Sequence, residues 1–111
     1  MSTPKTYTAL ITQQGTDDPS VAVLSNTFGG EIVWKREGGG VYIGKLAGAF
    51  PNNKTFIPFA NGDTWVKVSM PPHGEEEIAI VRYDDDTISI SFNSGNDGRL
   101  QQMPIRIEVY P

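Results

Sequence analysis

Apolar and polar side chains alternate along most of this 111-residue chain. A period of two is typical of half-buried β-strands, because successive side chains of a strand point to opposite faces of its sheet. In the first such segment, Tyr7, Ala9 and Ile11 fall on one face. The pattern predicts about nine short strands, at Thr6–Gln13, Ser20–Leu24, Glu31–Arg36, Val41–Leu46, Lys54–Ala60, Thr64–Met70, Glu77–Tyr83, Thr87–Phe92 and Ile105–Tyr110.

Turn residues separate these segments and predict how neighbouring strands connect. Gly38–Gly40 predicts a hairpin between the third and fourth strands. Asn61-Gly62 is the strongest turn signal, because both residues tolerate the positive φ of a type I′ hairpin turn. Asp84–Asp86 predicts a further hairpin with an acidic tip. Pro58 lacks an N–H, so we expect its strand to lie at a sheet edge or a bulge.

The number and length of these segments indicate a single all-β domain. A chain of this length has room for one hydrophobic core, and 12 glycines and 8 prolines suit frequent turns rather than long helices. Many short antiparallel strands usually pack as two sheets, which limits exposed edges. We therefore expect an N-terminal arm at residues 1–5 and, over residues 6–111, a jelly-roll-like antiparallel β-sandwich of eight or nine strands, with a barrel as the alternative.

Charge and composition argue against several classes of function. The formal net charge is -4 and the nine basic residues are scattered, so we expect neither nucleic acid nor an anionic membrane as a partner. Apolar runs such as Val21–Leu24 are far too short to span a bilayer. Residues 1–5 carry one lysine and precede threonines rather than an apolar run, so a soluble protein without a secretory signal is expected.

The chain contains no cysteine. Disulfides, thiolate nucleophiles and zinc-finger ligands are therefore excluded, and the fold must be stabilised by its core or by neighbouring chains. Because oligomerisation adds buried area, we expect a homo-oligomer.

One segment partly matches a phosphate-binding loop. Gly39, Gly44 and Lys45 satisfy the first part of the P-loop pattern, but Leu46 stands where the pattern requires a hydroxyl. The residues that follow, Ala47–Pro51, do not predict the helix whose N-terminus would bind phosphate. We expect no nucleotide and no other cofactor.

The acidic clusters and the single histidine offer little chemistry. Glu75–Glu77 and Asp84–Asp86 could donate oxygens to a cation, but consecutive carboxylates have the wrong spacing for a calcium loop. Solvated charges that protect a strand edge are the favoured interpretation, and cation binding at Asp84–Asp86 stays open. His73 has no second histidine and no cysteine to act with. We therefore predict no catalytic and no metal-binding residues, and a protein that is not an enzyme.

Four strand aromatics, Trp34, Tyr42, Trp65 and Tyr83, are candidate glycan contacts. Aromatic faces stack on sugar rings, but strand aromatics are more often buried in a core. Burial decides between these two interpretations.

Most of the chain resembles a family of small proteins and C-terminal modules of Bacteroidetes phages and prophages. The resemblance is carried in order by Tyr7–Gly15, Val23–Gly30, Gly40–Tyr42, Leu46–Phe50, Asn53–Phe56 and Met103–Pro111. Members often follow collagen-like or fibre-like stretches. The resemblance implies a virion module, as a head decoration, fibre or tail appendage, that is made in the bacterial cytoplasm, forms trimers and contacts other virion proteins. A receptor-binding module for a host-surface glycan is the alternative.

Overall fold

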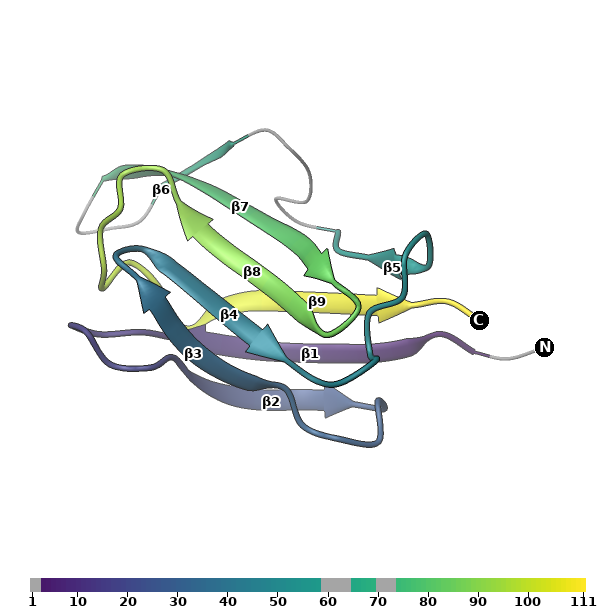
Figure 1. Ribbon diagram of the computed structural model, residues 1–111. Helices are drawn as coiled ribbons and strands as arrows, with labels where there is room; N and C mark the ends of the chain where they lie inside the picture. The colour runs from purple at the N-terminus through teal and green to yellow at the C-terminus, as the bar shows by residue number, and fades with distance from the viewer. Residues whose placement is uncertain (1–2, 59–64, 70–73) are drawn as a thin grey trace.

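The computed structural model describes residues 3–58, 65–69 and 74–111 (Figure 1). These residues form β-strands and turns, and none of them forms a helix. The strands are β1 (Lys5–Thr12), β2 (Ser20–Asn26), β3 (Val33–Gly38), β4 (Val41–Lys45), β5 (Thr55–Phe56), β6 (Val66–Ser69), β7 (Glu75–Asp84), β8 (Thr87–Phe92) and β9 (Met103–Val109). No helix in these parts of the chain is long and apolar enough to cross a membrane.

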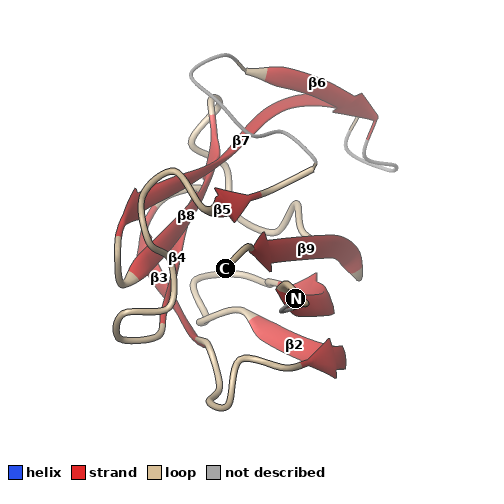
Figure 2. Ribbon diagram, turned by 90° about the vertical axis from the view of Figure 1, so that its right-hand side faces the viewer, coloured by secondary structure: helices blue, strands red, loops and turns tan. Residues whose placement is uncertain are grey.

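The strands form two antiparallel sheets that pack face to face. Sheet A has the order β2-β1-β9-β5, and sheet B has the order β3-β4-β8-β7-β6. Figure 2 shows the two sheets as separate layers. The predicted β-sandwich is confirmed. The alternative of a closed barrel is wrong, because the strand order leaves β2 and β5 at the edges of one sheet and β3 and β6 at the edges of the other.

Alternation along the strands builds the core between the sheets. The predicted inner face of β1 is confirmed, and β1 pairs with β9 so that Tyr7 lies opposite Ile107 and Ala9 opposite Ile105. Burying each large apolar side chain stabilises the fold by about 1.5–3 kcal/mol relative to leaving it exposed. The buried apolar residues are Tyr7, Ala9, Ile11, Ile32, Trp34, Tyr42, Phe50, Ile57, Ile78, Ile80, Ile88, Ile90, Phe92, Leu100, Ile105, Ile107 and Val109.

Glycine is required at one position in the middle of sheet B. Gly44 on β4 lies opposite Trp34 on β3, and a Cβ at Gly44 would lie 2.8 Å from the indole ring and 2.7 Å from Ile32. The missing side chain therefore makes room for the buried indole.

Two of the three predicted hairpins form. β3 pairs with β4 across Gly38–Gly40, and β7 pairs with β8 across the acidic tip. The predicted Asn61-Gly62 turn lies outside the described residues. In the described residues on its two sides, β5 pairs with β9 in sheet A and β6 pairs with β7 in sheet B.

The segment around Pro58 forms less strand than expected. We predicted a strand over Lys54–Ala60, but β5 contains only Thr55 and Phe56. It ends before Pro58, and it is an edge strand of sheet A, as the missing N–H of proline favours.

Candidate interaction surface on the outer face of sheet B

The structure separates the four candidate glycan contacts into two groups. Trp34 and Tyr42 are buried, with 5% and 0% of their surface exposed. The indole Nε1–H of Trp34 donates to the hydroxyl of Tyr7 at 3.2 Å inside the core. Both residues are therefore core side chains, and the expectation that they contact a glycan is corrected.

Trp65 and Tyr83 are 41% and 74% exposed, but they do not form one stacking platform. Val66, next to Trp65, pairs with Ile78 on β7. Tyr83 lies further along the same strand, roughly 17 Å from Ile78 at the rise of an extended strand. Each of these aromatics is accordingly a separate surface site.

The hydroxyl of Tyr42 belongs to a polar network that joins both sheets. It lies 2.8 Å from Asp97 Oδ1 and 2.9 Å from Gln13 Oε1. Gln13 is itself buried, and its amide Nε2 donates to the backbone oxygens of Gly15 and Asp17 at 2.9 and 3.0 Å. Burial, followed by the hydrogen bond to Asp97, raises the pKa of Tyr42 above its ordinary value.

Asp97 is the centre of this network. Arg36 donates to both of its carboxylate oxygens, at 2.9–3.2 Å, and the amide of Gly40 donates to Oδ1 at 3.2 Å. The hydrogen bonds from Arg36 are the main reason that the pKa of Asp97 falls to about 2. These groups satisfy one another, so the network positions the loops that carry them.

A second ion pair is formed by Glu76, whose side chain is only 7% exposed. Arg99 Nε donates to Glu76 Oε2 at 3.0 Å, and Ser94 Oγ donates to Oε1 at 2.6 Å. The interpretation of Glu75–Glu77 as solvated charges is wrong for Glu76, which binds the loop after β8 to β7. None of the buried side-chain nitrogen and oxygen atoms in the described parts lacks a hydrogen-bond partner.

The acidic tip shapes its own turn. Asp84 Oδ1 accepts the amide of Asp86 at 2.9 Å, Asp86 Oδ1 accepts the amide of Gly48 at 2.7 Å, and Asp85 pairs with Arg82. The hydrogen bond from the Asp86 amide is the main reason that the pKa of Asp84 is lowered. Within the described ranges, no three His, Cys, Asp or Glu side chains are grouped to hold a metal ion.

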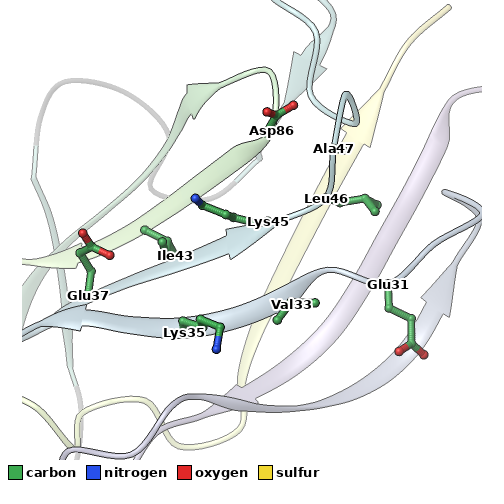
Figure 3. Close-up of a pocket in the computed structure, with 9 residues that line it drawn as sticks. All are labelled: Glu31, Val33, Lys35, Glu37, Ile43, Lys45, Leu46, Ala47 and Asp86. Atoms are coloured by element: carbon green, nitrogen blue, oxygen red, sulfur yellow. The ribbon is translucent and has the colours of Figure 1, made fainter.

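A surface hollow lies on the outer face of sheet B (Figure 3). We call it the β3–β4 hollow; it has a volume of about 670 Å³ and is open to solvent. Its apolar residues are Val33, Ile43, Leu46 and Ala47, and its charged residues are Glu31, Lys35, Glu37, Lys45 and Asp86.

Strand register arranges these side chains. Val33 pairs with Lys45, and Lys35 pairs with Ile43. Apolar and cationic groups therefore alternate across the two strands as well as along them. Lys45, the lysine of the partial P-loop match, is part of this surface, and β4 is followed by turns rather than by a helix.

A smaller neighbouring hollow extends this surface towards the acidic tip. It has a volume of about 280 Å³, and Tyr83 and Val41 contribute to its lining. It shares Glu37, Ile43 and Lys45 with the β3–β4 hollow. The outer face of sheet B thus carries one continuous surface of apolar and charged side chains from β3 to β7.

Sequence reasoning missed the β3–β4 hollow, although one signal was present. Ile32, Val33 and Trp34 are three consecutive apolar residues, and a strand cannot point all three towards one core. Ile32 and Trp34 are buried, so Val33 is left 55% exposed on the outer face.

A third hollow lies at the edge of sheet A near the end of the chain. It has a volume of about 410 Å³ and contains two aromatics that the sequence did not single out, Phe56 and Tyr110. They are 48% and 46% exposed. Asn53 and Lys54 complete its polar lining, and the hydroxyl of Tyr110 donates to Glu108 at 2.9 Å.

The chain matches no protein-family model, no curated protein and no solved structure.

Proposed function

We propose that this protein is a non-enzymatic structural component of a phage particle that acts through contacts with other protein subunits, copies of itself among them. The β3–β4 hollow carries the proposal. Its lining combines exposed apolar side chains with lysines and carboxylates. Another protein surface can bury the apolar side chains while its own charges pair with the lysines and carboxylates.

The shape of the hollow favours a protein over a small molecule. Small-molecule sites are usually deep and bury most of the ligand among a few convergent polar groups. Here lysines alternate with apolar side chains along two neighbouring strands of an open surface, where they suit the complementary charges of another protein surface.

The phage setting comes from the sequence resemblance. The resemblance supports a role in the virion as a head decoration, fibre or tail appendage, with other virion proteins as partners and a trimer as the expected form. A surface built for docking is consistent with that role, because a particle component depends on its shape and contacts.

Particle incorporation tests the proposal. We expect mass spectrometry to detect the protein in purified phage particles. We expect the amount of the Val33→Glu variant in the particles to be at least tenfold lower than that of the wild type. Val33 is 55% exposed and lies opposite Lys45, so the new carboxylate is tolerated by the fold while it removes an exposed apolar side chain from the hollow. Pro104→Glu is the matched control, because Pro104 is exposed on the other sheet. Absence of the wild-type protein from particles, or equal incorporation of Val33→Glu, would contradict the proposal.

A second candidate function, binding of a host-surface glycan, is favoured by the hollow at Phe56 and Tyr110. Two half-exposed aromatics beside Asn53 and Lys54 offer stacking faces and hydrogen-bond donors to a sugar. We expect saturable binding to host polysaccharide that is lost in Tyr110→Ala and retained in Tyr83→Ala. Binding that depends instead on Trp65 or Tyr83 would show that the glycan site lies at the aromatics indicated by the sequence.

A further inference from the structure

The four edge strands of the sandwich differ in how well they are protected from pairing with another strand. β5 has two residues and β6 has four, one of them Lys67. β3 carries Lys35, Arg36 and Glu37. Short length and charge are the usual devices that prevent edge-to-edge association.

β2 is neither short nor charged, and its one irregularity is a bulge at Leu24, beyond Val21–Val23. It is seven residues long, with the sequence SVAVLSN, and it contains no charged residue and no proline. Its neighbour in sheet A is β1, and its other edge is open in the described structure (Figure 1). Val23 and Leu24 are 47% and 64% exposed on this strand. An uncharged open edge with exposed apolar side chains fits the addition of another β-strand.

We propose that β2 pairs with β2 of a second copy of this chain, in antiparallel orientation about a two-fold axis at Ala22. The inference rests on the proposed function to the extent that self-association is part of it, and it replaces the trimer expected from the resemblance with a two-fold pair. Sheet A would then continue across the axis into sheet A of the partner subunit.

The faces of the strand limit the register to an axis that passes through a residue. Val21 and Val23 lie opposite Ile11 and Ala9 of β1, whose side chains point into the core, whereas Ala22 lies opposite Leu10 on the outer face. Residues directly opposite each other in a continuous sheet share a face. A two-fold axis at Ala22 meets this condition, because it places Val21 opposite Val23 of the partner subunit.

The distribution of charge around β2 favours a second copy of this chain as the partner that pairs with its open edge. Asp17 and Asp18 precede β2 at one end, and in an antiparallel pair the acids of the two copies stand at opposite ends of the shared ladder. Their separation is roughly 25 Å, which exceeds the Debye length at physiological salt. Pairing therefore brings apolar side chains together without like-charge repulsion in a protein of net charge -4.

A bulge limits the length of the ladder. The register between β1 and β2 shifts at Thr8/Ala9, which leaves Leu24 as the extra residue of β2. Continuous pairing is thus expected over Val21–Val23 of each copy, with Leu24 at each end of the pair. We expect a reversible dimer whose population rises with concentration.

Site-specific crosslinking tests the register. The chain has no cysteine, so Ala22→Cys introduces a single thiol at the proposed axis. Opposed residues of antiparallel strands have Cα atoms about 4.5–5.5 Å apart, within reach of a disulfide or a short bis-maleimide. We expect covalent dimers of Ala22→Cys and few of Ser69→Cys, an exposed position on the edge strand β6. Equal crosslinking at both positions, or none at Ala22→Cys, would overturn the proposal.

Sedimentation velocity tests the contact without a crosslink. We expect the wild type to form dimers as its concentration rises, and Ala22→Lys, which places two like charges directly opposite each other at the axis, to weaken dimerisation at least tenfold. Pro104→Lys, an exposed position on β9 of the same sheet, keeps the dimer. A trimer that persists in Ala22→Lys would overturn the two-fold contact. Absence from phage particles alongside a dimer that Ala22→Lys disrupts would instead refute the virion role and leave this contact intact.

Discussion

Arg36 and Asp97 lie 61 positions apart in the sequence and form a two-pronged ion pair, with Arg36 Nη2 2.9 Å from Asp97 Oδ2. Their side chains are 27% and 19% exposed. The pair joins β3 to the loop after β8, and through Tyr42 and Gln13 it reaches the end of β1. One carboxylate thus connects the two sheets at one end of the sandwich.

Removing this charge is expected to destabilise the fold. Asp97→Asn keeps the size of the side chain but weakens the hydrogen bonds from Arg36, the Gly40 amide and Tyr42. We expect a loss of about 1–3 kcal/mol in the free energy of unfolding, measured in urea. Asp17→Asn, on an exposed side chain, serves as the control and is expected to change stability by less than about 0.5 kcal/mol. Equal stability of the two variants would mean that the ion pair contributes nothing.

The same carboxylate predicts a dependence of stability on pH. The pKa of Asp97 is lowered from 3.8 to about 2 in the folded protein. Its stabilising contribution is therefore complete above about pH 4 and is lost as the pH falls towards about 2. The carboxyls of Asp84 and Glu108 also have lowered pKa values, so the comparison must be made between variants. Between pH 4 and 2, wild-type stability should fall more steeply than that of Asp97→Asn; parallel curves would assign the acid sensitivity to other groups.

Gly44 predicts the cost of adding a single methyl group. In Gly44→Ala the new Cβ would lie 2.7–2.8 Å from Ile32 and Trp34, which forces the core to shift. We expect a loss of about 1–3 kcal/mol, seen as a lower midpoint of thermal unfolding. Gly38→Ala is the matched control, because a Cβ there has nothing within 4 Å. Equal unfolding temperatures for the two variants would mean that the core accommodates a methyl group at Gly44 without cost.

The two tryptophans offer a test of burial by fluorescence. Trp34 is 5% exposed and Trp65 is 41% exposed, and the chain has only these two. Trp65→Phe leaves the buried indole as the reporter, so acrylamide should quench its emission several-fold less than that of Trp34→Phe. Similar quenching in the two variants would contradict the assignment of Trp34 to the core.

Local features of the fold were predictable from the residues. The strand that begins near Thr6 and the hairpins at Gly38–Gly40 and Asp84–Asp86 follow from alternation and turn residues a few positions apart. The edge position of the strand before Pro58 follows from a missing N–H. Each of these signals is local, and the element that it predicts is present in the tertiary structure.

The candidate surfaces were much less predictable. The three consecutive apolar residues around Val33 require one of them to face outward, but they do not identify which strand provides Lys45 beside it. Phe56 and Tyr110 come together only because β5 pairs with β9. Such neighbours depend on long-range pairing, which a local pattern does not encode.

By itself, the sequence determined that this is an all-β chain with one core and no cysteine chemistry, because alternation and composition are properties of the residues. The tertiary structure alone decided that Trp34 and Tyr42 are core residues, that Glu76 is buried with Arg99, and that β2 is left as an uncharged edge. The reason is that burial and edge position depend on the sheet each strand joins and on the neighbour beside it, and these are settled only when distant segments pair.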